Sequence, residues 1–183
     1  MIYLASSSPR RKELLKKAGI EFKIDVINVE EIFNHNLSFE ESIIDVAYQK
    51  GINVALKHPK DIVISADTIV YINGEILGKP KTKEDAKRML KMLSNAIHDV
   101  ITSVCIFKDG KVIKFSEITK VYFKNLTDED IETYISKTNV YDKAGSYAIQ
   151  SEINIVDHIE GSYTNVMGLP IERITAELKN LNN

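Results

Sequence analysis

The sequence predicts an α/β fold in which a mixed β-sheet is flanked by helices. In the first half of the chain, short apolar runs alternate with helix-like segments, which is typical of parallel strands joined by helices. In the second half, two strand-like runs over 97–107 and 111–123 flank a turn at 108–110, which predicts an antiparallel hairpin. One sheet should therefore contain both kinds of pairing. The 183-residue chain has no repeat and no Pro/Gly-rich linker, so we expect a single domain over 1–183.

The chain begins with an apolar run, expected as a strand at 2–6, that leads directly into a helix. Ser8 is placed to cap this helix and Pro9 to be its first residue. We expect the helix to cover 9–18, because Gly19 favours the left-handed conformation that ends many helices.

Capping pairs and turn residues place the remaining elements. Ser38 and Glu41 form a capping box for a helix that continues to about Lys57. The apolar run 62–66 is expected as a short strand that ends at Asp67. The other expected elements are a strand over 22–29, two strands joined by an Asn73-Gly74 turn, a helix capped by Thr82 and Asp85 that continues to about Leu93, a helix capped by Thr127 and Asp130, a Gly-containing loop over 141–150, and a final helix opened by Pro170.

The segment Ser6-Ser7-Ser8-Pro9-Arg10-Arg11 predicts an anion-binding site at the start of the first helix. Free N–H groups, the positive end of the helix dipole and two arginines act together there, and phosphate is the expected anion. Arg11 continues an apolar seam of Leu14, Leu15 and Ala18, so its side chain should project over the sheet edge. A solvated helix start is the alternative interpretation.

Two further segments carry charged groups suited to phosphate chemistry. Asp67 interrupts an apolar stretch, and its burial is costly unless a metal ion, an arginine or a reacting water is its partner. Lys79 lies between Gly78 and Pro80, where a stiff loop could present its charge to a phosphate. The alternatives are an aspartate that caps a turn and a lysine in a solvated turn.

Two other polar groups stand at predicted strand ends. Gln150 is expected to end an apolar strand inside 141–150, and its carboxamide offers a donor and an acceptor that suit the edge of a nucleobase. Glu31 follows the predicted strand over 22–29 with a second glutamate, Glu30, and is a candidate metal ligand. Solvated glutamates at a strand end, and a glutamine that merely closes a strand, are the alternatives.

Several function classes are disfavoured by composition and by absent motifs. A net charge of −2, with no basic stripe interleaved with aromatic residues, argues against stable nucleic-acid binding. The phosphate-loop, dinucleotide-binding, nucleophile-elbow and zinc-protease motifs are all missing, and the four histidines lack metal-ligand spacing. The single cysteine, Cys105, lies in an apolar run and is expected to be a buried, inert thiol. With no signal-like or membrane-spanning stretch, we expect a cytoplasmic protein that does not bind membranes.

Taken together, seven segments resemble the Maf family of nucleoside triphosphate pyrophosphatases, in the same order and over nearly the whole chain. Asn95 departs from the pattern, since family members often have glycine in this segment, but asparagine also tolerates left-handed angles. The matching segments are Leu4–Arg11 with Leu14-Leu15, Ala66–Val70, Leu77–Pro80, His98–Thr102, Asp142–Gln150 and Gly161–Pro170.

The resemblance implies a fold like that of inosine-triphosphate pyrophosphatases, with a central cleft. It implies hydrolysis of a nucleoside triphosphate between the α- and β-phosphates, with a divalent cation such as Mg²⁺ or Mn²⁺. The segment 142–150 is similar to the branch that prefers dTTP and UTP. The alternatives are the branch acting on 7-methyl-GTP and a nucleotide-binding regulator of septum formation. A homodimer is expected only from this resemblance.

The resemblance also assigns roles to individual residues. It makes Asp67 the proposed general base. The residues themselves leave two roles open for Asp67, deprotonating the attacking water or holding the metal, and they make Glu31 the best second carboxylate for a metal because it also ends a predicted strand. The residues expected to bind the triphosphate or to select the base are Ser6, Arg10, Arg11, Lys50, Thr68, Lys79 and Gln150.

Overall fold

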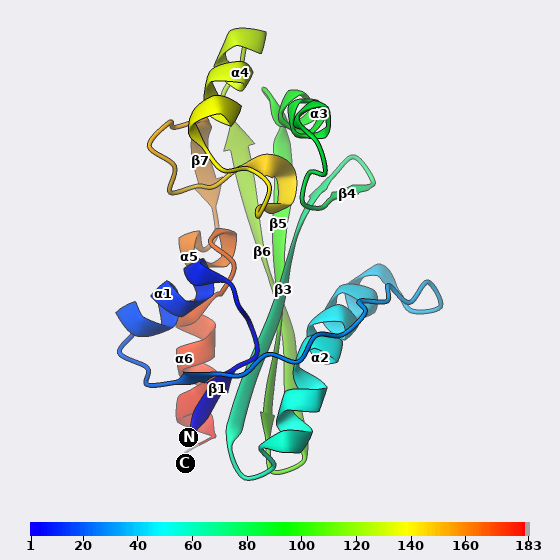
Figure 1. Cartoon of the computed structure of the whole chain (residues 1–183), viewed down its shortest axis with the longest axis vertical. Helices are drawn as coiled ribbons and strands as arrows, with labels where there is room; N and C mark the ends of the chain where they lie inside the picture. The colour runs from blue at the N-terminus through cyan, green and yellow to red at the C-terminus, as the bar shows by residue number, and fades with distance from the viewer. Residues whose placement is uncertain (182–183) are drawn as a thin grey trace. The chain divides into compact units, whose positions relative to one another are not determined.

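A computed structural model describes residues 1–181 of the chain (Figure 1). The strands in order are β1 (Ile2–Leu4), β2 (Lys23–Ile24), β3 (Ile62–Ile72), β4 (Glu75–Leu77), β5 (Ile97–Lys108), β6 (Lys111–Phe123) and β7 (Val156–Glu160). The helices in order are α1 (Pro9–Lys17), α2 (Phe39–Lys57), α3 (Lys83–Leu93), α4 (Asp128–Lys137), a 3₁₀ turn η1 (Ala144–Ser146), α5 (Tyr163–Val166) and α6 (Ile171–Asn180).

Within residues 1–181, seven strands form one mixed sheet, which confirms the predicted fold class. The strand order is β2-β1-β3-β5-β6-β7, and β4 pairs with β3. Strand β1 runs parallel to β2 and β3, whereas the β3–β4 and β6–β7 pairs are antiparallel. No helix in this part of the chain is long and apolar enough to span a membrane.

The chain divides into two compact units. Unit 1 comprises 1–67, 102–117 and the residues from 168 onward, and unit 2 comprises 68–101 and 118–167. The core of unit 1 includes Ala47 and Val54 of α2, Val63 of β3 and Phe107 of β5. The core of unit 2 gathers buried residues of its strands, α3, α4 and the following loop, among them Val70, Leu90, Val121, Ile131, Tyr134 and Tyr147.

Local signals placed most helix ends correctly. Capping boxes are formed at Ser38 for α2 and at Thr127 for α4, and Thr82 accepts a hydrogen bond from the Asp85 amide at the start of α3. Gly19 ends α1 with a φ of 69°. Pro9 begins α1 as predicted, but the Ser8 side chain makes no capping hydrogen bond.

The predicted strand over 22–29 is wrong beyond its first residues, because β2 contains only Lys23 and Ile24. Asp25 accepts hydrogen bonds from Lys57 and His58 at the end of α2, each at 2.7 Å, which directs the chain towards that helix. Ile27 then packs against the core of unit 1. The residues after Ile24 thus form an irregular segment that packs on that core through Ile27.

Strand β3 is longer than predicted, so Asp67 lies within it and not at its end. Thr68, Ile69 and Val70 are β-branched and continue the extended backbone. Strand β1 pairs with β3 through Ile62–Ile64, and β4 pairs through Val70–Ile72. Asp67 therefore lies between two paired stretches.

Elements of the last third of the chain also differ from expectation. Gln150 does not end a strand; it lies in a turn that follows η1. Strand β7 and the short helix α5 were not predicted.

The turn expected at Asn95 is present. Its left-handed φ of 52° shows that asparagine supplies this turn.

Candidate functional site

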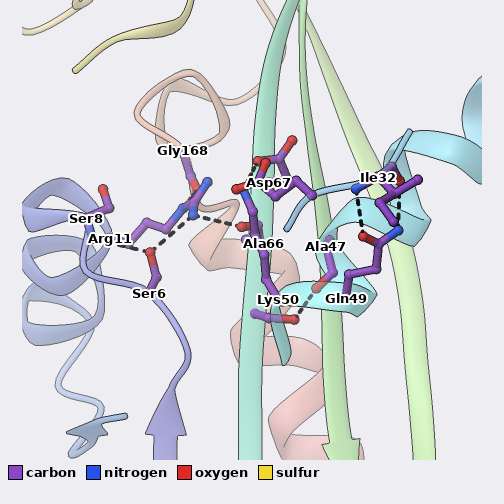
Figure 2. Close-up of polar contacts among 12 residues, drawn as sticks. Ser6, Ser8, Arg11, Ile32, Ala47, Gln49, Lys50, Ala66, Asp67 and Gly168 are labelled. Carbon is purple, nitrogen blue, oxygen red and sulfur yellow. Dashed lines mark hydrogen bonds and ion pairs between the residues drawn. The ribbon is translucent and has the colours of Figure 1, made fainter. Parts of the chain in front are cut away.

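Arg11 connects the start of α1 to strand β3 within unit 1 (Figure 2). Its Nη1 donates to the Ala66 carbonyl at 2.8 Å and to the Ser6 hydroxyl at 3.2 Å, and its Nε donates to the Gly168 carbonyl at 2.8 Å. The predicted orientation of Arg11 over the sheet is thus confirmed. The apolar seam itself ends at Leu15, because Ala18 is exposed.

The Ser6 hydroxyl, and not that of Ser8, makes side-chain hydrogen bonds at the turn into α1. Its Oγ accepts a hydrogen bond from the Ser8 amide at 3.3 Å as well as the bond from Arg11. Ser6 is buried at the end of β1, so the turn into α1 is held from its inner side. Arg10 follows the helix start and is half-buried.

The charges around Arg11 oppose one another. Burial lowers the pKa of the Arg11 guanidinium, the negative charge of Asp67 raises it, and the neighbouring positive charge of Arg10 lowers it further. An arginine side chain nevertheless stays protonated in proteins. The start of α1 therefore carries fixed positive charge beside the Asp67 carboxylate.

Lys50 of α2 joins the two carboxylates predicted to be functional. Its Nζ forms an ion pair with Asp67 Oδ1 and a second, at 3.1 Å, with Glu31 Oε1. Glu31 does not end a strand, as the sequence suggested, but lies in the irregular segment between β2 and α2. The structure thus brings Glu31, Lys50 and Asp67 together inside unit 1.

This arrangement fits a divalent cation. Two carboxylates, Asp67 and Glu31, converge on a single positive group, the Lys50 ammonium. Carboxylate oxygens are preferred ligands of Mg²⁺ and Mn²⁺, and Mg²⁺ commonly takes one or two carboxylates together with substrate phosphates. Among residues 1–181 no group of three or more His, Cys, Asp or Glu side chains is placed to hold a metal by itself.

Close packing of α2 on β3 sets the position of Lys50. Gly51 faces β3, and a Cβ added to it would lie 2.8 Å from Ser65 Cβ and 2.5 Å from Phe107 Cε2. The Ser65 hydroxyl also donates to the Ala47 carbonyl at 2.6 Å. The missing side chain at Gly51 allows an approach that a larger residue would prevent. Sequence reasoning missed this feature, although a glycine inside a helical pattern is its visible sign.

The other three predicted site residues belong to unit 2 and are described within it. Thr68 is half-buried in β3, and Lys79 is exposed in the loop that follows β4. Gln150 is exposed in its turn. The Gly145 amide donates to the Gly78 carbonyl at 3.1 Å, so the loop of Lys79 contacts the segment that leads to Gln150.

Buried aromatic side chains anchor this segment. Tyr147 lies 2.8 Å from His98 Nε2 through its hydroxyl, and the Tyr134 hydroxyl accepts a 3.0 Å hydrogen bond from the Ala148 amide. Burial lowers the pKa of His98 to about 4, which keeps its ring neutral near pH 7. His98 is thus a buried, neutral partner of Tyr147.

Cys105 is buried, as expected, and burial raises the pKa of its thiol to about 12.

Fold and site together define an α/β protein with cationic groups and a lysine-paired carboxylate around the turn into α1. The Ham1 protein of Staphylococcus aureus has a solved structure with a TM-score of 0.54 and 16% identity, covering 98% of both chains, and therefore shares this fold. The chain belongs to the Maf-like protein family, whose model matches residues 1–181.

Relatives cover almost the entire chain. It is 47% identical to the dTTP/UTP pyrophosphatase of Bacillus anthracis over 182 residues, which is 99% of this chain and 95% of that protein. The dTTP/UTP pyrophosphatase of Bacillus mycoides (strain KBAB4) is 46% identical over 179 residues, covering 97% and 94% of the two chains. These comparisons confirm the family that the seven segments resembled.

Proposed function

We propose that this protein hydrolyses dTTP and UTP to the nucleoside monophosphate and pyrophosphate. The observation that carries this proposal is the placement of Asp67 against Lys50, one residue after the carbonyl that binds Arg11. Family membership and the names of the Bacillus relatives support the substrate and the reaction. We also propose a cytoplasmic location, which rests on the sequence pattern, and a homodimer, which rests on the family resemblance alone.

The proposed reaction is an in-line displacement at the α-phosphorus. A water molecule attacks the α-phosphorus, its proton goes to the Asp67 carboxylate, and the bond from the α-phosphorus to the oxygen bridging to the β-phosphate breaks. Pyrophosphate leaves with the electrons of that bond. A positioned general base typically accelerates such a step by about 10²–10⁴-fold.

The positive groups supply charge stabilisation. Lys50, which pairs with both carboxylates, is proposed to stabilise the developing negative charge, and Arg10 and Arg11 are proposed to bind the phosphates at the start of α1. Lys79 is proposed to bind the triphosphate from its own loop as a point charge. A divalent cation held by Asp67 and Glu31, when bound, would neutralise phosphate charge and polarise the attacked phosphoryl group.

Base selection is proposed for Gln150, with Thr68 and Arg10 as further specificity residues. The carboxamide of Gln150 is exposed, and the segment before it is anchored through Tyr147 and Ala148, which gives it a defined place. A carboxamide matches the adjacent N3–H and O4 of uracil and thymine, where a carboxylate lacks the donor.

The test measures kcat/KM for UTP, dTTP, CTP and 7-methyl-GTP in the wild type and in Gln150→Glu. We expect the wild type to prefer UTP and dTTP, and the variant to lose more activity on these two than on the others. A uniform loss would remove Gln150 from base selection. Preference for 7-methyl-GTP would contradict the proposed substrates, and absence of turnover with every triphosphate would favour a binding protein.

A further inference from the structure

We propose that Gln49 is a positioning residue, which holds Glu31 beside Lys50 for the reaction. This inference rests on the proposed function, because it concerns the same group of side chains. Gln49 precedes Lys50 on α2 and was not among the predicted site residues. It acts on Glu31 through the backbone of the next residue, Ile32.

The carboxamide of Gln49 binds both backbone groups of Ile32 (Figure 2). The Ile32 amide donates to Gln49 Oε1 at 3.0 Å, and Gln49 Nε2 donates to the Ile32 carbonyl at 2.8 Å. Nε2 also donates to Asp45 Oδ2 at 2.7 Å, one helical turn earlier. The Gln49 side chain thus satisfies both backbone groups of Ile32, as a paired strand would.

Within residues 1–181, neither the side chain of Glu31 nor that of Ile32 makes a contact of comparable strength. The Ile32 side chain is 61% exposed, so hydrophobic packing contributes little to holding this residue. The Glu31 side chain is 53% exposed, and an ion pair at such an exposed position is weak because water screens it. The paired hydrogen bonds from Gln49 are therefore the contact that sets the path of the backbone next to Glu31.

A second anchor lies farther along the same segment. The buried Ser42 hydroxyl donates to the Asn34 carbonyl at 2.8 Å, two residues beyond Ile32. This bond holds the segment as it enters α2, but it leaves Glu31 free to rotate away from Lys50. Loss of Gln49 should therefore displace Glu31 while the fold and the start of α2 remain.

The chemistry of a carboxamide is required for this role. Ile32 presents one donor and one acceptor, and a glutamine side chain complements both at once. Methionine has nearly the same length but makes neither bond. Gln49→Met thus removes the contact with little change in volume, and Asn53→Met is the matched control because Asn53 is an exposed amide on the same helix.

The first measurement is a double-mutant cycle on kcat/KM for UTP. We expect Gln49→Met to lower it by about tenfold to a hundredfold, the scale of a displaced catalytic group, and Asn53→Met to leave it unchanged. In the Glu31→Gln background, Gln49→Met should cause no further loss. Additive losses would overturn the proposal, because Gln49 would then act on something other than Glu31.

The second measurement does not depend on turnover. Hydrogen exchange at the Ile32 amide should be slow in the wild type and in Asn53→Met, and fast in Gln49→Met, with circular dichroism confirming that all three are folded. Unchanged protection in Gln49→Met would overturn the proposal. If the wild type failed to hydrolyse UTP, the proposed function would be refuted, while this exchange experiment would still decide whether Gln49 holds the segment. Should Gln49→Met not fold, Gln49→Leu, which also lacks both the donor and the acceptor, takes its place in both measurements.

Discussion

The Arg11 guanidinium donates a 2.8 Å hydrogen bond to the carbonyl of Ala66, the residue immediately before Asp67. An arginine at the start of α1 is thereby fixed to the strand that carries the proposed base. The same guanidinium reaches Ser6 and Gly168, so three segments distant in sequence meet at one side chain. The start of α1 and the strand that carries Asp67 are thus held together by hydrogen bonds to the backbone.

Arg11→Lys should weaken both stability and substrate binding. A lysine carries the charge but lacks the planar fork that serves three acceptors in fixed directions. We expect the free energy of unfolding to fall by about 1–3 kcal/mol and KM for UTP to rise. Denaturant unfolding and steady-state kinetics measure these effects, with Lys16→Ala, an exposed cation on the same helix, as the control. Wild-type values for Arg11→Lys would show that its hydrogen bonds have no part in the site.

Asp67→Asn should lower kcat at least about 10²-fold while the protein stays folded. Asparagine keeps the shape of the side chain but accepts no proton and cannot pair with Lys50 through charge. The matched control is Asp61→Asn, since Asp61 precedes β3 and pairs only at the surface with the Met1 amino group at 2.9 Å. Near-normal turnover in a folded Asp67→Asn variant would exclude Asp67 as the base.

Gly51→Ala should disturb the contact of α2 with β3, since the new methyl group would meet Ser65 and Phe107. Overpacking of this kind typically costs about 1–3 kcal/mol. Displacement of α2 should also lower kcat, because Lys50 is the adjacent residue. Adding Ser65→Gly removes one of the two clashing side chains, so the double variant should be more stable than the sum of the two single changes predicts. Strict additivity in chemical denaturation would contradict this account of the helix position.

His98 should make the protein less stable in mild acid. Its pKa is about 4 in the folded chain and about 6.5 when unfolded, so the unfolded state binds the extra proton between these values. Stability should therefore fall as the pH drops from about 6.5 to 4, by up to about 3 kcal/mol. His98→Gln retains a partner for Tyr147 without titrating, and its free energy of unfolding should change less over this range. Parallel pH profiles for the two proteins would refute the assignment.

The elements predicted correctly are those with local causes. Capping pairs such as Ser38 with Glu41, the Asn73-Gly74 turn and the helix-ending Gly19 act within a few residues, so their effect is visible in sequence. The failures occur where tertiary contacts decide the backbone. Beyond Ile24 the predicted strand is replaced by an irregular segment whose Ile27 packs on the core of unit 1, and the turn at Gln150 follows the buried contact of Tyr147 with His98.

Among the candidate site residues, too, those placed by local sequence were predicted from it, and those placed by tertiary contacts were not. Arg11 was predicted from its place on the helix, and its orientation is confirmed. The meeting of Lys50 with Asp67, 17 residues apart, depends on the close approach of α2 to β3 at Gly51; the glycine is visible in the sequence, but the strand that it approaches is not. Lys50 was therefore identified only through the family resemblance, and Gln49 was not identified at all.

The most direct test of the central claim is the identity of the products formed from UTP. The wild-type protein is incubated with UTP and a divalent cation, and the products are separated by ion-exchange chromatography, with Asp67→Asn as the inactive control. Attack at the α-phosphorus predicts UMP and pyrophosphate in equal amounts. Release of UDP and orthophosphate would place the attack at the γ-phosphate and contradict the account.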